Sequence, residues 1–372
     1  MKEWNSPYNP FNSIKAVAHS ERFNAIINEQ YLPPVVVNLD VTGECQYHCT
    51  WCHHRSKQVR SQGMPPLSWR LARTFPYFAA NWKKNGHGVE ACCIVGSQGD
   101  ALLYEHLPYL LKGLHNNNID VGLVTNGYGF TDSLIDSAVH YSKFIGISMD
   151  AAKKSTYDSV KHCPDDAWDK VTSNIAQITD SLRSNGLRND VGYKFLILPE
   201  NYLEIYDACK LARDLGVRYV QIRPADLPDT ARAKIEVFEV EDQISEAINT
   251  LEIPGVFEIA GVRHKFTNDF RKKLPEYCYM TPLTVTVTSD GHVWPCVDRR
   301  CDEATLLADC GKYGWSALSD VWGTSKHVSI VHDVINCGGS GPECNIRCSN
   351  YGYDVLFRDV FSEKDAMDIR LI

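Results

Sequence analysis

Residues 45–52 read Cys45-Gln46-Tyr47-His48-Cys49-Thr50-Trp51-Cys52, with the cysteines spaced C-x-x-x-C-x-x-C. They follow an apolar run that ends in Asp40-Val41-Thr42. Three thiolates this close together can bind one face of a metal cluster. A [4Fe–4S] cube is ordinarily held by four cysteines, so one of its irons would lack a protein ligand here. We therefore expect a reactive cluster at Cys45, Cys49 and Cys52, with one iron open to a small molecule.

Composition restricts the class of protein. The chain has 372 residues, a formal net charge of −8 and 44% hydrophobic residues, which fits one large domain or a large domain with a smaller companion. No apolar run approaches the roughly 18 residues that a membrane span needs. The N-terminus lacks an apolar stretch of signal-peptide type. We expect a cytoplasmic protein that does not enter the membrane, and the negative charge offers no global basic field for nucleic acid.

Cysteine content supports a metal site. The chain has 14 cysteines, and without an export signal these favour metal ligands or redox thiols over disulfides. Three of them lie at residues 45–52 and seven after residue 277, and only four lie between these groups.

Strand and helix patterns alternate from residue 35 to residue 222. The sequence predicts strands at 35–41, 89–95, 121–125, 144–149, 192–198 and 218–222, separated by helices at 67–84, 105–116, 132–141, 165–184 and 200–215. Six β-α units with short connections predict an α/β fold, a partial (β/α)6 TIM-like barrel. Catalytic groups in such folds lie at the carboxyl ends of the strands, which is where the cysteine loop comes.

Four segments follow from these patterns. Residues 1–34 form a polar lead-in with a short helix at 16–27, and residues 35–224 form the barrel. Residues 225–275 are a charged connecting segment. Residues 276–372 are loop-rich and cysteine-dense, with a β-hairpin that turns at Asp290-Gly291, and this composition is typical of a small domain held by metal.

The cysteine loop after the first strand resembles the radical S-adenosylmethionine (radical SAM) enzymes, whose motif has this spacing and an aromatic residue, here Trp51, before the last cysteine. The resemblance implies a [4Fe–4S] cluster whose fourth iron is chelated by S-adenosylmethionine. It also implies a 5′-deoxyadenosyl radical that abstracts a hydrogen atom from the substrate. The alternative is a structural zinc site completed by His48, His53 or His54, in a binding module without catalysis.

The resemblance also implies residues that contact the cofactor. Residues 97–101 align with the glycine-rich stretch that ends in Glu-Pro in relatives and meets the amino group of S-adenosylmethionine; here Asp100 stands in place of the Glu. Arg223, at the end of the sixth strand, could bind the cofactor carboxylate through two hydrogen bonds. Taken alone, such residues also suit ordinary turns and caps. The implied set is Trp51, Gly99, Asp100, Asn126, Ser148, Asp150 and Arg223.

The late cysteines resemble the auxiliary-cluster extension of this superfamily. Its full form, SPASM, holds two further clusters, and its shortened form, twitch, holds one. The close cysteine pair of the full form has no match here, so the twitch arrangement fits best, and Cys301, Cys310 and Cys337 are one ligand short of a second all-cysteine cluster. A zinc or disulfide arrangement of this region remains open. The implied ligands of one auxiliary [4Fe–4S] cluster are Cys278, Cys296, Cys344 and Cys348, with Cys337 as an alternative ligand.

An auxiliary cluster bears on the reaction. Oxidising an alcohol after hydrogen abstraction leaves a radical that must lose one electron and one proton, and a nearby cluster can accept the electron. Similarity to twitch enzymes that oxidise aminocyclitol alcohols implies an oxidoreductase of biosynthesis. We expect it to dehydrogenate a carbinol of a sugar, an aminocyclitol or a similar small polar metabolite. A flavodoxin- or ferredoxin-like protein would supply the reducing electron.

Two other radical reactions remain open. In a redox-neutral epimerase, Cys163 would return a hydrogen atom to the substrate radical, with His162 lowering its pKa or acting as a base; free cysteines more often pack as small apolar groups. In a peptide maturase, a ribosomal peptide would be the substrate. The short N-terminal lead-in leaves no room for a leader-binding domain, which favours a small molecule without excluding a peptide.

Overall fold

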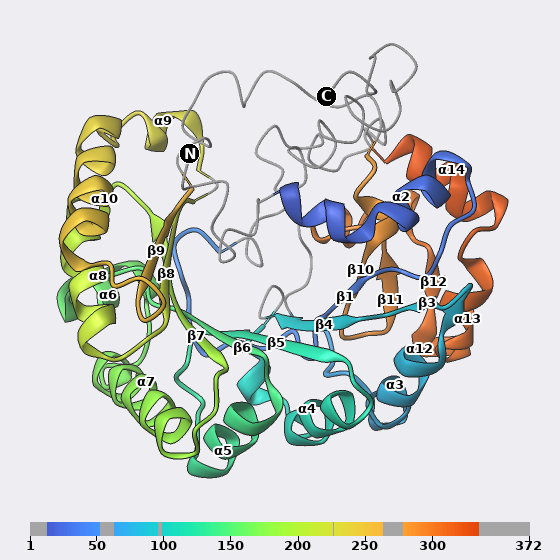
Figure 1. Cartoon of the computed structure of the whole chain (residues 1–372), viewed down its shortest axis with the longest axis horizontal. Helices are drawn as coiled ribbons and strands as arrows, with labels where there is room; N and C mark the ends of the chain where they lie inside the picture. The colour runs from blue at the N-terminus through green and yellow to red at the C-terminus, as the bar shows by residue number, and fades with distance from the viewer. Residues whose placement is uncertain (1–12, 53–62, 96–98, 226, 263–277, 335–372) are drawn as a thin grey trace.

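The computed structural model describes residues 13–52, 63–95, 99–225, 227–262 and 278–334. Ten strands in this part of the chain form one sheet in the order β12-β11-β10-β1-β4-β5-β6-β7-β8-β9. The sheet is curled, and the helices from α3 to α10 follow its convex side (Figure 1). The predicted α/β partial barrel is therefore confirmed.

Parallel strands build the barrel. Each of the six predicted strands is present, and each pairs in parallel with the next. Their carboxyl ends meet at one edge of the sheet, so the loops that follow them share one mouth. The strands are β1 (Val36–Leu39), β4 (Ala91–Val95), β5 (Asp120–Thr125), β6 (Phe144–Ser148), β7 (Asp190–Ile197) and β8 (Tyr219–Pro224).

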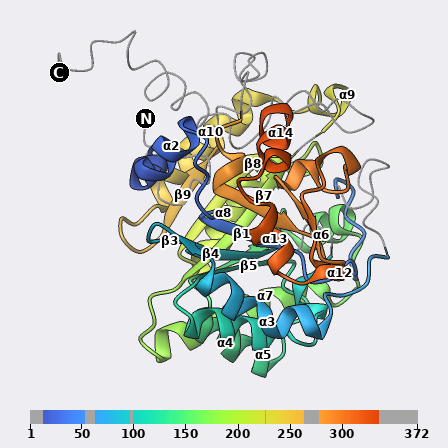
Figure 2. The same cartoon turned by 90° about the vertical axis from the view of Figure 1, so that its right-hand side faces the viewer.

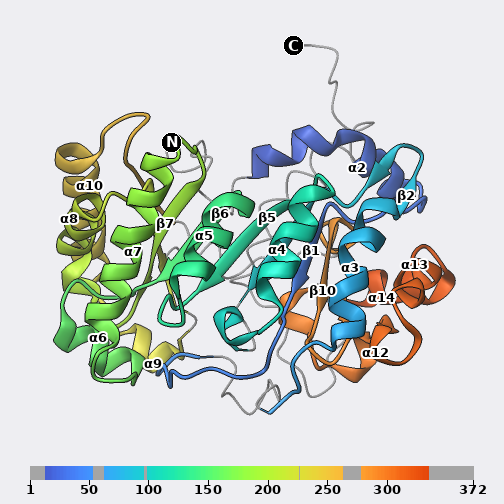
Figure 3. The same cartoon turned by 90° about the horizontal axis from the view of Figure 1, so that it is seen from below.

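Helices cover the outer face. Figure 3 shows α7, α5 and α4 side by side in front of the sheet. The first long helix begins where the Ser68 hydroxyl accepts a hydrogen bond from the Leu71 N–H at 3.4 Å, an ordinary N-cap. The helices are α3 (Trp69–Asn81), α4 (Leu107–Asn116), α5 (Asp132–Tyr141), α6 (Lys154–Lys161), α7 (Ala167–Ser184) and α8 (Ile205–Asp214).

Burial alternates along the barrel strands. In β7, Val191, Tyr193 and Phe195 are buried against the helices, whereas Lys194 and Leu196 are half-buried on the concave side. Because successive side chains of a strand point to opposite faces, the apolar core lies between the sheet and the helices. The concave side carries the polar residues.

Residues 225–275, expected to connect two parts of the chain, contain regular structure that the sequence did not predict. The helix α9 (Asp229–Arg232) is short; α10 (Val237–Leu251) is long, and β9 (Glu258–Gly261) pairs in parallel with β8. The sequence contains a signal for α10. Its buried residues Val240, Ile244, Ala247 and Leu251 recur at helical spacing, but the charged residues between them hide the pattern.

The C-terminal part of the chain joins the same sheet. β10 (Thr284–Val287) pairs in parallel with β1, and β11 (His292–Trp294) pairs antiparallel with β10, so the predicted hairpin is confirmed. At its turn Gly291 has a φ of +91°, and a Cβ there would collide with the backbone of Gly311. The remaining elements are β12 (Ala308–Asp309), α12 (Cys310–Tyr313), α13 (Ser316–Val321) and α14 (Ser325–Asp333).

The C-terminal elements pack against α3 of the barrel and against the N-terminal helix (Figure 2). The Trp315 indole donates to the Leu71 carbonyl on α3 at 2.9 Å. The N-terminal helix α2 (Ser20–Ile27), which follows a 3-10 turn at Ser13–His19, buries Phe23 in a small core that includes Val331 of α14. No helix among the described residues combines the length and the apolar character needed to cross a membrane.

Candidate functional site

The C-terminal end of α6 holds the cysteine loop that follows β1. The His48 N–H donates to the carbonyls of Lys161 at 3.1 Å and His162 at 3.2 Å. The Thr50 N–H donates to the Val160 carbonyl at 3.2 Å. The last carbonyls of a helix have no partner within it, so the loop satisfies them. The backbone between the first and last cysteines of the motif is thereby fixed.

The three thiols of the loop suit an iron–sulfur cluster. Cys45, Cys49 and Cys52 are half-buried and carry no disulfide. Burial raises the pKa of Cys45 to about 11 and that of Cys49 to about 12. Without metal these two thiols hold their protons at neutral pH, and because iron binds the thiolate, loading a cluster would release protons.

The described part of the loop does not gather three ligands for a single metal ion. In the described ranges, no three Cys, His, Asp or Glu side chains come close enough together to bind one ion. A cube places a different demand on the protein, because each of its cysteines binds a different iron. Three spaced thiols on one loop meet that demand.

Lys161 is buried beside the loop and was not predicted. Its ammonium forms an ion pair with Asp150, donates to the Ser148 hydroxyl at 3.1 Å, and lies 5.0 Å from the centre of the Trp51 ring. Lys161 is 1% exposed and Asp150 is fully buried. Burial alone would lower the pKa of Lys161, but Asp150, and then Cys49, raise it above its usual value. A lysine in the last turn of a helix is ordinary, so no local pattern singles it out.

Asp150 is fixed in the wall of the mouth. Its backbone has a φ of +56°. One carboxylate oxygen accepts from the Leu196 N–H at 2.6 Å, and its carbonyl accepts from the Asn201 amide at 2.7 Å. The other carboxylate oxygen accepts from the Ser148 hydroxyl at 2.9 Å. Ser148 and Asp150, expected to contact the cofactor, are thus tied to each other and to Lys161.

Asp100, expected to meet the amino group of the cofactor, binds the end of β5. Its carboxylate accepts from the Thr125 hydroxyl at 2.8 Å, from the Asn126 N–H at 2.7 Å and from the Leu102 N–H at 3.1 Å. Asp100 is 2% exposed. Burial raises its pKa, although these hydrogen bonds act in the opposite direction. In the described structure its carboxylate aligns two strand ends.

Asn126 and Gly99 both lie against the cysteine loop. The Asn126 amide donates to the Cys45 sulfur at 3.7 Å. A Cβ added to Gly99 would lie 2.6 Å from the Thr42 carbonyl oxygen and closer still to that of Glu44. Only glycine fits where the loop after β4 crosses the loop after β1. The structure therefore brings Trp51, Gly99, Asp100, Asn126, Ser148 and Asp150 together around the cysteines.

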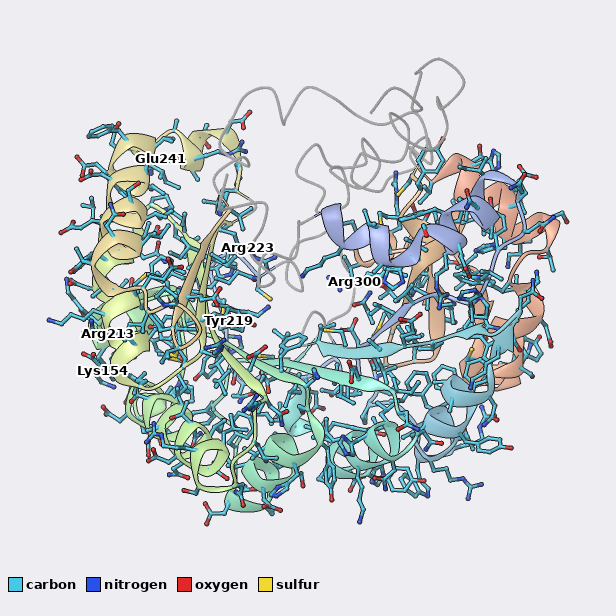
Figure 4. The ribbon with its side chains drawn as sticks, in the orientation of Figure 1. Lys154, Arg213, Tyr219, Arg223, Glu241 and Arg300 are labelled. Atoms are coloured by element: carbon cyan, nitrogen blue, oxygen red, sulfur yellow. The ribbon has the colours of Figure 1, made fainter. Side chains whose placement is uncertain are left out.

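Arg223 lies on the concave side of β8. Burial lowers its pKa, while Asp150 and Asp298 act to raise it. Asp150 also forms the ion pair with Lys161, so Arg223 faces the same region as the residues expected to contact the cofactor. Its guanidinium is directed toward the concave interior in Figure 4.

Cys163 follows α6 and is half-buried. Its sulfur lies 3.9 Å from a carboxylate oxygen of Asp158. Burial, and then the charge of Asp158, raise its pKa to about 11. The residue is therefore a protonated thiol at neutral pH, which is the form that a hydrogen-atom donor needs.

The auxiliary cysteines are placed only in part. Cys278 precedes β10 and is buried, and Cys296 follows β11. Cys301 is half-buried, and the fully buried Cys310 opens α12. Cys337, Cys344 and Cys348 lie outside the described residues, as do His53 and His54.

The sequence of the barrel matches a known family. Residues 39–212 match the model of the Radical SAM superfamily. The barrel region of the chain, residues 39–212, belongs to this superfamily. The protein is a radical SAM enzyme, and membership implies a [4Fe–4S] cluster and S-adenosylmethionine. The protein is also similar to a probable GTP 3′,8-cyclase of Pyrobaculum aerophilum, with 22% identity over 276 residues, which cover 69% of this chain and 82% of that one.

Two solved radical SAM-type folds extend the similarity beyond residue 212. SuiB of Streptococcus suis bound to S-adenosylmethionine has 12% identity and a TM-score of 0.62, covering 86% of this chain and 71% of SuiB. The protein anSMEcpe with bound AdoMet has 14% identity and a TM-score of 0.58, covering 90% of this chain and 99% of anSMEcpe. At these identities the likeness is one of fold.

Replacing Lys161 tests the buried ion pair between Lys161 and Asp150. We expect Lys161→Met to lower the free energy of unfolding by about 3–5 kcal/mol, because it leaves Asp150 buried without its cation. The control is Lys154→Met on the same helix, whose lysine is 42% exposed; it should cost less than about 1 kcal/mol. The double variant Lys161→Met with Asp150→Asn should recover part of the loss. Urea unfolding measures all three, and equal effects of the two lysine variants would contradict the assignment.

Proposed function

We propose that the protein is a radical SAM oxidoreductase that dehydrogenates a carbinol of a sugar, an aminocyclitol or a similar small polar metabolite. Residues 35–224 would be the catalytic barrel, and residues 276–372 an auxiliary domain of the twitch type. One auxiliary [4Fe–4S] cluster, bound by Cys278, Cys296 and cysteines among 337, 344 and 348, would accept the electron that the substrate loses.

The residues at the carboxyl ends of the barrel strands would have separate roles. When bound, the cluster and S-adenosylmethionine supply the radical that removes a hydrogen atom from the substrate. Cys45, Cys49 and Cys52 would hold the cluster, and Arg223 would bind the cofactor carboxylate. Asp100 and Lys161 would act as positioning residues, since both are occupied in holding the surrounding loops.

The observation that carries the proposal is the parallel pairing of β10 with β1. Val36 pairs with Thr284 and Leu39 with Val287. Cys278 precedes β10, and Cys296 follows the antiparallel strand β11, so both lie toward the amino-terminal end of β1. The motif cysteines follow the carboxyl-terminal end of the same strand.

This pairing separates the two cysteine groups by about one strand length. Four residues of parallel strand rise about 13 Å. A substrate over the concave side of β1 would therefore have one cysteine group toward each end. That placement supports an oxidation in which the cofactor radical near the motif cysteines would take a hydrogen atom from the substrate. The auxiliary cluster near Cys278 and Cys296 would then accept one electron, with loss of a proton.

Peptide maturation is the second candidate. The fold similarity includes SuiB bound to the precursor peptide SuiA and anSMEcpe bound to peptides. These structures favour a peptide chain as substrate, whereas the twitch-like cysteine pattern favours a small alcohol. A synthetic peptide from a neighbouring short gene that stimulated 5′-deoxyadenosine formation would favour this candidate.

Iron content tests the two-cluster assignment. The anaerobically reconstituted protein should bind about eight irons, as two [4Fe–4S] clusters require. Cys278→Ala with Cys296→Ala should bind about four, still cleave S-adenosylmethionine with a chemical reductant, and oxidise no substrate. The triple variant at Cys45, Cys49 and Cys52 should lose cleavage instead. Eight irons in the Cys278 and Cys296 variant would contradict the proposal.

Cys163→Ala separates the dehydrogenase from an epimerase. We expect turnover to change less than about twofold, since a dehydrogenase returns no hydrogen atom to its substrate and a free cysteine usually packs as a small apolar group. The measurement is product formation beside Cys209→Ala, which alters a buried cysteine on α8. Loss of product in Cys163→Ala, with cofactor cleavage retained, would support the epimerase.

A further inference from the structure

Two cationic side chains lie together on the concave side of the sheet. Lys194 is on β7 and Arg223 on β8, and the register places Gln221 beside Lys194 and Leu196 beside Arg223. The two cations are thus offset by two residues on neighbouring strands and share one face. A Cβ added to Gly146 of β6 would collide with the Lys194 side chain, so this lysine lies across the inner face.

Neither cation is paired with an acidic side chain of the described residues, although Asp150 is close enough to raise the pKa of both. In the part of the chain that the structure describes, Lys194 and Arg223 form no ion pair and no side-chain hydrogen bond. Burial, and then the charge of Arg223, lower the pKa of Lys194 to about 8. Holding two like charges close together in a half-buried place is unfavourable, and an anion between or beside them would remove the cost.

A third cation reaches the interior from the other side. Arg300 is 9% exposed, and its Nε and Nη1 atoms are buried without a hydrogen-bond partner among the described residues. Its Nη1 lies 3.7 Å from a carboxylate oxygen of Asp40, which is beyond hydrogen-bond distance. Figure 4 shows Arg223 and Arg300 approaching the concave interior from opposite sides.

Asp40 and Cys93 connect this arginine to the lysine. Lys194 and Asp40 both act on the pKa of Cys93, a half-buried thiol on β4. Cys93 therefore lies between the lysine of β7 and the acid that follows β1. These electrostatic interactions, with the ion pair between Asp40 and Arg300, reach across the inner face from β7 to the loop that carries Arg300.

A count of the charged side chains that the structure describes shows that the interior has more cations than acidic partners. Lys161 is paired with Asp150, and the single carboxylate of S-adenosylmethionine would occupy Arg223. Lys194 and Arg300 remain, with Asp40 as the only acid that forms an ion pair with either in the described part of the chain. Buried charges require a partner, so a second oxyanion is expected there.

We propose that the substrate carries an oxyanion, a carboxylate or a phosphate, and that Lys194 and Arg300 bind it on the concave side of the sheet. This inference rests on the proposed function, in which the substrate lies over that face. It narrows the small polar alcohols to anionic ones, such as sugar phosphates or hydroxy acids.

Anion binding to the reconstituted holoenzyme tests the proposal. With S-adenosylmethionine bound and ionic strength held constant with chloride, sodium phosphate or sodium acetate is titrated, and the melting temperature is followed. We expect one of the two anions to raise it saturably, and the stronger one identifies the oxyanion class. Lys194→Met and Arg300→Met should each raise that dissociation constant about tenfold or more, whereas Lys194→Arg and Arg300→Lys should preserve binding.

The control is Arg213→Met, which removes a half-buried arginine of α8 on the outer side of the barrel (Figure 4) and should bind the anion as the wild type does. No saturable shift, or equal shifts in all variants (an adventitious ion only), would overturn the proposal. So would displacement of the anion by S-adenosylmethionine, because the site would then be that of the cofactor carboxylate. The assay needs no turnover, so a failed carbinol oxidation leaves its result standing.

Discussion

The contact between the end of α6 and the cysteine loop is the constraint on which the site depends. Three backbone hydrogen bonds from His48 and Thr50 end on carbonyls of residues 160–162, and the Lys161 ammonium beneath them is neutralised by Asp150. A helix end thus supplies polar backbone groups and one buried ion pair to a loop of thiols. Because Asp150 neutralises Lys161, the pair orders the loop without adding a net charge beside the thiols.

Hydrogen bonds also order Asp100 and Asn126, two other residues expected to contact the cofactor. Asp100 joins the ends of β4 and β5 through Thr125 and Asn126, and Asn126 in turn contacts Cys45. Buried polar groups of this kind are hydrogen-bonded to each other first. Asp100 is thus linked through Asn126 to the sulfur of Cys45.

Much of this was predictable from the sequence. The β-branched runs and the spacing of Cys45, Cys49 and Cys52 predicted the six barrel strands, the α/β fold and the position of the loop after the first strand. The sequence could not reveal that Lys161 is buried against Asp150, because the pairing depends on how α6 folds back over β6. It missed β9 and α10 because charged residues interrupt the apolar face of α10. Arg300 gave no local signal, since its role depends on a chain reversal after β11.

The position of β1 has a consequence for how the chain can be divided. β1 is hydrogen-bonded on one side to β4 and on the other to β10, so its polar backbone is covered only when the C-terminal hairpin is present. A fragment ending at residue 262 would turn β1 into an unprotected sheet edge, and exposed edges recruit strands from other molecules. The barrel therefore depends on the hairpin to stay in solution. A barrel expressed alone would aggregate before its chemistry could be assayed.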